Sequence, residues 1–417
     1  MHCFFHPLQL IASLGLIALT ACCPVGKQLL GDPQNPYPLH SERKVGEIVH
    51  LPTGDLVSQK DMMAVVRDAK IVYIGETHDN PASHRLELEV LKSLAEIHPE
   101  RQALGMEMFV RSQQPALDRW VAGKLDEKGF LRESHWLENW NIDFAYYRDL
   151  LDFARKHKIP IIALNAEKTL VDAELVKPTN QVSAADQSRL PKLDMTDPYQ
   201  RAMVAAYFSD HTHGKMELDG FIRAQTVWDE TMAESVAGYL ASPAGKEMRL
   251  MVIAGGNHVN YGFGIPRRAF RRLPASYIMI GGQEIRIPEN KKNQMMNVTL
   301  PIFPMIPYDF LAYMDYEELP KTGARLGVMI EPAALGRGLM VMKILPGSNA
   351  ERAGLQTGDL LLTLDGEPLK DNIDLIYALK QKNPDDKMTL IVERHGKTMN
   401  VEVHIPLSEE RDHQGNQ

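Results

Sequence analysis

The stretch Lys70-Ile71-Val72-Tyr73-Ile74-Gly75-Glu76-Thr77-His78-Asp79-Asn80 decides the fold. Its first half is a continuous apolar run, which is typical of a strand buried on both faces. Its second half is polar and begins at a glycine, which lets the chain turn sharply while its backbone approaches a ligand. A helical pattern follows from His84 to Ile97. The segment therefore predicts a strand, a turn and a helix, with polar groups at the carboxyl end of the strand.

Four further apolar runs of the same kind follow, separated by amphipathic stretches. They span residues 102–107, 159–164, 249–254 and 275–280. Buried strands that alternate with helices indicate a mostly parallel sheet covered on both faces. A long helical stretch over 198–240 separates the third strand from the fourth. The predicted fold class is α/β, with a mostly parallel sheet flanked by helices and a helical insertion.

The pattern changes after about residue 325. Short strands over 339–344, 360–364 and 388–392 lie between glycine-containing turns, and one helix is expected over 372–382. This pattern predicts a small β-barrel-like domain at the C-terminus. The expected organisation is a signal peptide over 1–21, a linker over 22–45, an α/β domain over 46–288, a connector over 289–324, a small β domain over 325–405 and a tail over 406–417.

Composition excludes several classes of protein. The 417 residues are 44% hydrophobic and 24% charged, which are ordinary values for a globular protein. The formal net charge is −8 and no long basic run occurs, so we expect no nucleic-acid partner. The cysteines are Cys3, Cys22 and Cys23. The region after Pro24 therefore has neither a disulfide nor a catalytic or metal-binding thiolate.

The N-terminal segment has the pattern of an export signal. An apolar run from Leu8 to Ala21 is too short for a membrane span but suits a signal peptide. It ends in Leu19-Thr20-Ala21-Cys22, which resembles a bacterial lipobox, although the preceding residues include no lysine or arginine. The resemblance implies that Cys22 carries the lipid and anchors the protein. Because Cys23 follows Cys22 where an aspartate would favour the inner membrane, we expect the protein at the outer membrane, facing the periplasm. The alternative to a signal peptide is that the apolar run is a helix of a soluble domain.

Polar residues follow three of the predicted strands. Glu76 and His78 come after the first strand, Glu107 ends the second, and His258 follows the fourth. The carboxyl ends of parallel strands share one edge of the sheet, where ligands bind. Two carboxylates and two imidazoles match a divalent metal site or an acid–base pair. Alternatively, each is an ordinary loop residue satisfied by nearby backbone.

A series of motifs runs in order along residues 45–285. They are Gly75-Glu76-Thr77-His78-Asp79-Asn80 with His84, Gly105-Met106-Glu107-Met108-Phe109, Gln113, Leu117-Asp118, Trp140, Ala163-Leu164-Asn165, Ala224-Gln225, Trp228-Asp229-Glu230-Thr231-Met232-Ala233, Gly256-Asn257-His258-Val259 and Gly264-Ile265-Pro266. In these motifs the chain resembles the ChaN-like haem-binding uptake lipoproteins. The resemblance implies a homodimer that binds haem between its protomers, with a tyrosine of one subunit on the iron and a histidine of the other helping to hold the haem.

The same motifs are similar to a broader group that includes the Tiki/TraB and erythromycin-esterase-like proteins. In its hydrolytic members, the residues that match Glu76, His78, Glu107 and His258 serve as metal ligands or general base. The resemblance therefore leaves two functions open. The favoured one is a haem-binding protein of iron acquisition, and the alternative is a metal-dependent hydrolase or peptidase.

Two tyrosines are candidates for the ligand of the haem iron. Tyr207 lies four residues before His211, on one face of a predicted helix, and His213 follows closely. Tyrosine is a known protein ligand of haem iron. Tyr261, three residues after His258, is the next candidate. Alternatively, Tyr207 packs in the core of a cap helix and the two histidines lie at the surface.

The C-terminal motifs resemble those of bacterial HtrA-type PDZ domains. They are Arg325-Leu326-Gly327-Val328, Leu345-Pro346-Gly347-Ser348-Asn349-Ala350, Ala353-Gly354-Leu355, Gly358-Asp359-Leu360-Leu361 and Asp365-Gly366. The resemblance implies that a C-terminal peptide or exposed strand of a partner binds as an added strand. Leu326, Gly327 and Val328 would then form the carboxylate-binding loop, and Leu375 and Leu379 would line the groove. Alternatively, the domain is a spacer or dimerisation module.

Overall fold

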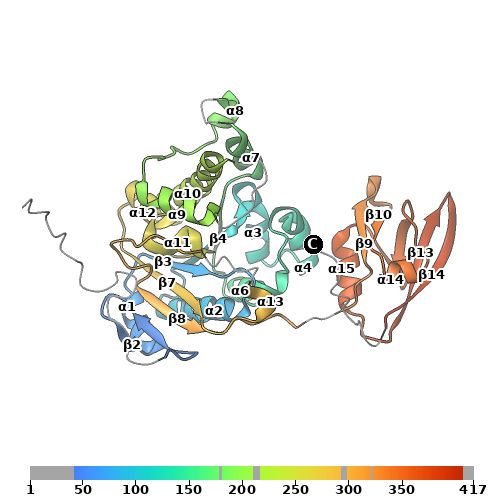
Figure 1. The fold of residues 1–417 in the computed structure, drawn as a ribbon, viewed down its shortest axis with the longest axis horizontal. Helices are drawn as coiled ribbons and strands as arrows, with labels where there is room; N and C mark the ends of the chain where they lie inside the picture. Colours follow the sequence, from blue (N-terminus) through green and yellow to red (C-terminus); the bar gives the residue numbers. More distant parts are fainter. Residues whose placement is uncertain (1–41, 178–180, 210–216, 293–297, 321–322, 407–417) are drawn as a thin grey trace, which may run out of the picture.

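A computed structural model describes residues 42–177, 181–209, 217–292, 298–320 and 323–406. The chain forms a large α/β region followed by a small β region (Figure 1). The helices are α1 Gln59–Val66, α2 Pro81–Ile97, α3 Gln114–Val121, α4 Glu127–Glu133, α5 Trp136–Asn139, α6 Arg148–Lys156, α7 Lys168–Val176, α8 Ala184–Gln187, α9 Pro198–Ser209, α10 Leu218–Ala241, α11 Gly256–Val259, α12 Ile265–Arg272, α13 Glu289–Lys292, α14 Asn349–Arg352 and α15 Asn372–Lys380.

The large region is built on an eight-stranded sheet of order β2-β1-β8-β7-β3-β6-β4-β5. Strands β3 to β8 pair in parallel, whereas β1 and β2 are antiparallel. The strands are β1 Ile48–His50, β2 Asp55–Val57, β3 Ile71–Glu76, β4 Gln102–Val110, β5 Ile161–Asn165, β6 Arg249–Gly255, β7 Tyr277–Glu284 and β8 Phe310–Met314. The predicted parallel α/β class is confirmed.

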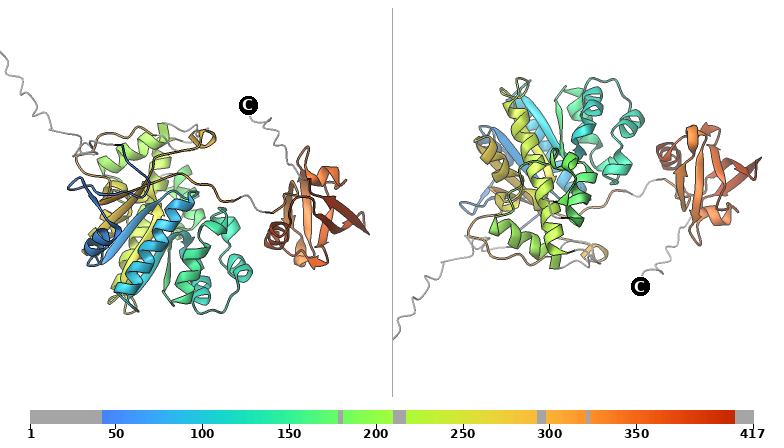
Figure 2. Two further views of the ribbon diagram at one scale, coloured as in Figure 1. Left: turned by 90° about the horizontal axis from the view of Figure 1, so that it is seen from below. Right: turned by 90° about the horizontal axis from the view of Figure 1, so that it is seen from above.

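Alternate residues of the central strand enter two different cores, one on each face of the sheet. Val72 and Ile74 pack in a cluster with apolar residues of α2, α3 and α6, whereas Ile71 and Tyr73 pack with residues of α10 and α12. All six residues of β3 are buried. This double burial explains why the strand is continuously apolar in sequence. Figure 2 shows α2 and the long helix α10 running alongside the sheet.

The segment expected to be a connector, residues 289–324, contains sheet structure. Strand β8 pairs in parallel with β7 and antiparallel with β1. Its alternating burial differs from the continuous burial of the central strands, because it lies nearer the antiparallel end of the sheet. Helix α13 also lies in this segment. The helical insertion expected over 198–240 contains the two helices α9 and α10, and the shorter helices α7 and α8 precede it.

The small region is an antiparallel sheet in which β14-β13-β11-β10-β9 are neighbours and β12 pairs with β11. Its strands are β9 Val328–Pro332, β10 Leu339–Ile344, β11 Leu360–Leu364, β12 Glu367–Pro368, β13 Lys387–Arg394 and β14 Lys397–His404. Strand β9 is the last strand in this order, and its outer edge faces helix α15. An edge of this kind accepts an added strand.

Helix α15 of the small region packs against α4 of the large region (Figure 1). The Arg132 guanidinium lies 2.5 Å from Asp371 and 2.7 Å from Asp374. Lys380 lies 2.9 Å from Asp143. The contact between the two regions combines these ion pairs with apolar packing, because Ile373 of α15 is buried in the core cluster of the large region.

Within the described ranges, none of the helices has both the length and the apolar character that crossing a membrane requires. The predicted signal peptide and Cys22 lie outside these ranges.

Candidate functional site

Glu76 and His78 form a close pair at the carboxyl end of β3. The Nδ1 atom of His78 lies 2.5 Å from Oε1 of Glu76. The same oxygen accepts a hydrogen bond of 2.7 Å from the hydroxyl of Tyr147. The His78 ring meets Trp140 edge-on at 4.9 Å between centroids. The Glu76 side chain is buried, whereas 36% of the His78 side chain remains exposed.

Glu107 of β4 and His258 of α11, the short helix that follows β6, form a second pair. His258 Nε2 lies 3.4 Å from Glu107 Oε1, and the other Glu107 oxygen accepts a hydrogen bond of 2.7 Å from the backbone of Gly255. On its other side, His258 Nδ1 lies 2.6 Å from Asp229 of helix α10. The imidazole is therefore held between two carboxylates.

Gly255 separates the two pairs at the end of β6. A Cβ at this position would lie 2.9 Å from two ring atoms of His78 and 3.7 Å from Glu107 Oε2. Only a residue without a side chain leaves His78 in its place. All four residues predicted from the strand ends thus meet at one edge, because β3, β6 and β4 are direct neighbours.

The ionisable side chains at this edge of the sheet shift one another's pKa values. Burial raises the pKa of Glu76 to about 7, helped by the charge of Glu87. Burial opposes the charged form of His258, but Glu107 and Asp229 outweigh it and raise its pKa to about 10. Burial likewise opposes ionisation of Glu107, yet His258 lowers its pKa to about 2. At neutral pH His258 is an imidazolium beside two carboxylates.

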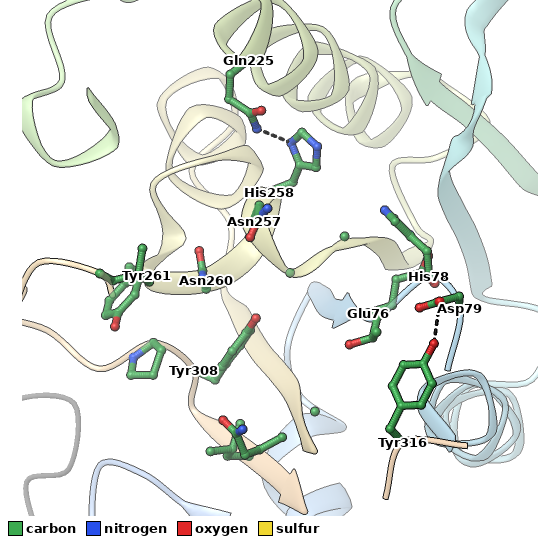
Figure 3. A pocket seen from close by; sticks show the side chains of 18 of the residues that line it. Glu76, His78, Asp79, Gln225, Asn257, His258, Asn260, Tyr261, Tyr308 and Tyr316 are labelled. Carbon is green, nitrogen blue, oxygen red and sulfur yellow. Dashed lines mark hydrogen bonds and ion pairs between the residues drawn. The ribbon is translucent and has the colours of Figure 1, made fainter. Parts of the chain in front are cut away.

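A cavity of about 620 Å³ opens in front of these residues. Figure 3 shows Tyr261 at one end of it and Glu76 and His78 at the other, with Tyr308 between them. The Tyr308 ring fits because Gly281 and Gly75 lack side chains; a Cβ on either would lie within 2.6 Å of it. The volume is in the range of sites that hold cofactors and small ligands.

The candidate tyrosines take different positions. Tyr261 lines the cavity and has a left-handed backbone with φ of 55°, an unusual conformation for a residue other than glycine. Tyr207 packs in an aromatic cluster with Tyr261, Phe263 and Phe303, and its hydroxyl accepts a hydrogen bond from Asn260. It is not among the residues that line the cavity. His211 and His213 lie outside the described residues.

A second cavity of about 330 Å³ lies on the other side of the Glu107–His258 pair. Both residues line it, together with Trp140 and Trp228. His258 therefore borders both cavities. This second cavity has no signal in the sequence, because its walls come from five separate segments.

The predicted metal site is not assembled as such. Among the described residues, Glu76, His78, Glu107 and His258 do not form a group whose ligand atoms all lie within 4.8 Å of one another. Such a group is formed by Glu76, His84 and Glu87. The residues that sequence reasoning did not single out at this edge are Glu87, Tyr147, Asp229 and Tyr308.

The five residues predicted to bind a peptide come together in the small region. A groove of about 520 Å³ runs between β9 and α15. Its walls include the predicted residues Leu326, Gly327, Val328, Leu375 and Leu379. Asp143 of the large region also lines this groove.

Comparison with known families accounts for both regions. Residues 62–269 match the family described as haem-binding uptake, Tiki superfamily, ChaN. Residues 324–405 match the PDZ domain family. The chain contains a ChaN-like haem-binding domain and a PDZ domain. The resemblances seen in the sequence motifs are thereby confirmed.

Individual proteins also align with parts of this chain. A solved structure of cofacial haem binding to ChaN of Campylobacter jejuni aligns with 66% of this chain and 98% of its own, at 16% identity and a TM-score of 0.49. The PDZ domain is 36% identical over 72 residues to the periplasmic pH-dependent serine endoprotease DegQ of Escherichia coli, which is 17% of this chain and 16% of that protein. A probable DegP-like periplasmic serine endoprotease of Marinomonas is 35% identical over 68 residues, or 16% of this chain and 14% of that one. The chain spans about a sixth of the length of these proteases.

Proposed function

We propose that this chain is a haem-binding lipoprotein of haem or iron acquisition, anchored by Cys22 to the outer membrane and facing the periplasm. The cavity of about 620 Å³ carries this proposal, because it lies at the sheet edge of the ChaN-like domain and presents tyrosine and histidine side chains together. Tyrosine, as phenolate, is a ligand that suits haem iron. Tyr261 is the ligand we favour over Tyr207, because Tyr261 lines the cavity.

The apolar rim of the cavity fits the porphyrin ring of haem. Leu300, Pro307 and Leu311 line the cavity beside the tyrosines. Ile302, two residues from Leu300, has 73% of its surface exposed. The proposed active form is a homodimer in which a second copy of this chain covers the bound haem, as the resemblance to the ChaN-like family implies.

The PDZ domain would dock a partner protein through a C-terminal peptide or an exposed strand. The open groove beside the edge strand β9 supports this role, since an added strand would pair with the free edge. The lipid anchor would keep both domains at the membrane surface where haem is delivered.

A hydrolase is the weaker function for this site. The Asp229–His258–Glu107 arrangement resembles an acid–base relay. However, a general base must be unprotonated, and the pKa of His258 is raised to about 10 by the two carboxylates. His258 therefore does not suit the role of general base at neutral pH.

Haemin titration of three tyrosine variants assigns the ligand. We expect Tyr261→Phe to shift the visible spectrum and weaken haemin binding at least tenfold. Tyr207→Phe and the control Tyr239→Phe, which changes a half-buried tyrosine of α10, should bind as the wild type does. If Tyr207→Phe alone lost binding, the ligand would be Tyr207. If haemin did not saturate the wild-type protein, the proposed function would fall.

A further inference from the structure

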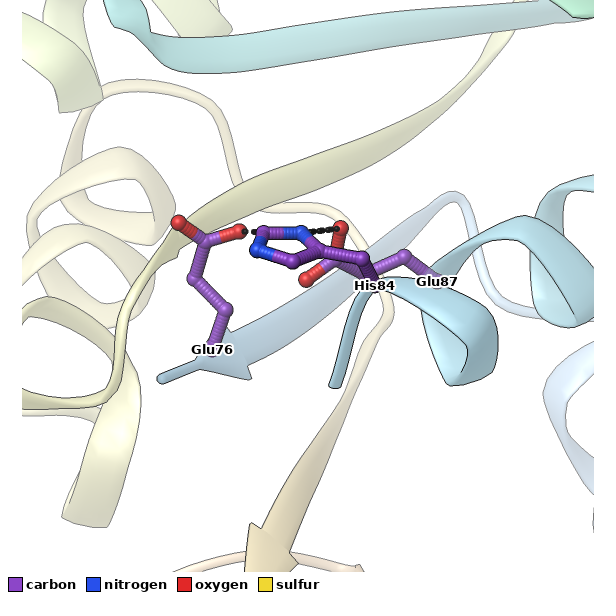
Figure 4. Close-up of side chains that lie close together, drawn as sticks. All are labelled: Glu76, His84 and Glu87. Atoms are coloured by element: carbon purple, nitrogen blue, oxygen red, sulfur yellow. Dashed lines mark hydrogen bonds and ion pairs between the residues drawn. The ribbon is translucent and has the colours of Figure 1, made fainter. Parts of the chain in front are cut away.

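A buried group of metal-ligating side chains lies directly behind the cavity wall. Glu76 ends strand β3, while His84 and Glu87 lie on the first turns of helix α2 (Figure 4). Their ligand atoms all lie within 4.8 Å of one another. The side chains of Glu76 and Glu87 have no exposed surface, and that of His84 has 6%. The group lies outside the set of four residues predicted from the strand ends, apart from Glu76.

A hydrogen bond to the backbone fixes the tautomer of neutral His84. The nitrogen that faces the carboxylates then carries no proton. Its Nε2 atom lies 3.0 Å from the backbone carbonyl of His78. A carbonyl only accepts, so Nε2 must carry hydrogen. In the neutral ring, Nδ1 then offers a lone pair toward Glu87 Oε2 at 3.1 Å and Glu76 Oε2 at 3.6 Å. Three acceptors that face one another need either a shared proton or a cation between them.

The described residues around this group do not offer Glu76 and Glu87 a lysine or arginine partner. Among the described residues, Glu76 Oε2 and Glu87 Oε1 have no hydrogen-bond partner. The ion pairs of these two carboxylates within the described ranges are with histidines, and none is with lysine or arginine. A divalent cation would balance both carboxylates and engage all three ligands.

The spacing and the ligand types indicate the class of cation. Ligands at zinc-like bond lengths in a tetrahedral arrangement lie about 3.3 Å apart. The two distances from His84 Nδ1, 3.1 and 3.6 Å, bracket that value. A histidine whose other nitrogen donates to a backbone carbonyl is the usual orientation of a metal ligand. One imidazole with two carboxylates suits zinc, manganese or ferrous iron.

We propose that Glu76, His84 and Glu87 together bind one divalent transition-metal ion. The ion would hold Glu76 from behind while the other oxygen of that carboxylate keeps its contacts with Tyr147 and His78. The site would thereby fix the wall of the cavity. It does not depend on haem binding.

Metal content and calorimetry test the site. The full chain, purified without a histidine tag and stripped with chelator, would be titrated with Zn²⁺ and Mn²⁺. We expect one ion per chain with dissociation in the micromolar range or below, retained on gel filtration. Glu87→Gln should weaken binding at least 100-fold. The control Glu89→Gln, which changes an exposed residue of the same helix, should bind normally. The cysteines are present in all three proteins, so binding by sulfur would not change with the variant.

Each result of these titrations either supports the metal site or overturns it. Absence of a stoichiometric ion in the folded wild type would overturn the proposal, and so would an ion that binds Glu87→Gln as tightly as wild type. If Glu87→Gln did not fold, cobalt absorption of the wild type would decide. Visible bands typical of nitrogen and oxygen ligands would support the site, and bands of thiolate ligation or of a fully hydrated ion would contradict it.

Discussion

The hydroxyl of Tyr147 donates a hydrogen bond of 2.7 Å to Oε1 of Glu76, 71 residues away in sequence. Tyr147 immediately precedes helix α6 and is fully buried among Trp136 and Trp140. The bond ties the helical layer that contacts the PDZ domain to the end of the central strand. It therefore links the position of Glu76, at the cavity wall, to packing elsewhere in the domain.

Removing this hydroxyl tests its contribution to stability. Tyr147→Phe takes a donor from a buried carboxylate and should lower the free energy of unfolding by about 1–3 kcal/mol. Urea denaturation measures the change. Tyr239→Phe, at a half-buried site on α10, should change stability by less than about 0.5 kcal/mol. If both changes lowered the free energy of unfolding equally, the hydrogen bond to Glu76 would add no stability beyond that of an ordinary half-buried hydroxyl.

Two glycines offer a matched pair of alanine substitutions. Gly255→Ala places a methyl group 2.9 Å from the His78 ring, so we expect His78 to be displaced and stability to fall by about 1–3 kcal/mol. Gly238 lies in helix α10 with no atom within 4 Å of the added Cβ. Gly238→Ala should therefore stabilise the protein by about 0.5–1 kcal/mol, since alanine favours helix. Urea denaturation of both variants checks the opposite signs.

The contact between the two domains should depend on pH and salt. Burial opposes ionisation of Asp374, but a backbone hydrogen bond and Arg132 lower its pKa. A carboxyl with a lowered pKa contributes its full stabilisation above its ordinary value of about 4, and this is lost as the pH falls through the lowered value. Small-angle scattering should therefore show a constant radius of gyration between pH 5 and 8 and a larger radius as the pH falls below about 4.

Charge reversal separates the domains without acid. Arg132→Glu would repel Asp371 and Asp374, so the radius of gyration should increase at pH 7, as it should for the wild type in 1 M salt. Arg337→Glu, an exposed change elsewhere in the PDZ domain, should leave it unchanged. An unchanged radius in Arg132→Glu would show that the ion pairs of Arg132 are not needed to hold the two domains together.

The PDZ groove should bind peptides with an apolar C-terminus. Leu379 lines the groove, so Leu379→Lys should weaken binding of a labelled peptide at least tenfold in fluorescence anisotropy. Met399 is 40% exposed on β14, at the opposite end of the sheet from β9. Met399→Lys should bind normally. Binding that is insensitive to both changes would place the peptide elsewhere.

Much of the architecture is predictable because local signals agree with the fold. Residues 339–344 and 360–364 form strands with the predicted bounds, since turn residues flank them on both sides. Glu76, His78, Glu107 and His258 are found at one edge because parallel topology alone brings strand ends together. The motif at 75–80 also locates the turn into α2.

Other features have no local signal. Strand β8 is five residues long and lies in a proline-rich segment, so its membership of the sheet depends on pairing with β7. Tyr308 enters the cavity only because distant glycines leave room for its ring. Asp229 and Glu87 look like ordinary polar residues of helices, and only tertiary packing turns them toward His258 and His84.

The central claim is that the ChaN-like domain binds haem in the cavity beside Tyr261. Haemin titration of the full chain, followed by visible absorption and by light scattering, tests it most directly. The account predicts a saturable change in absorption at one haem per chain, with dimers forming as haem binds. Haemin that partitions without saturation, with spectrum and mass unaltered by Tyr261→Phe, would contradict it.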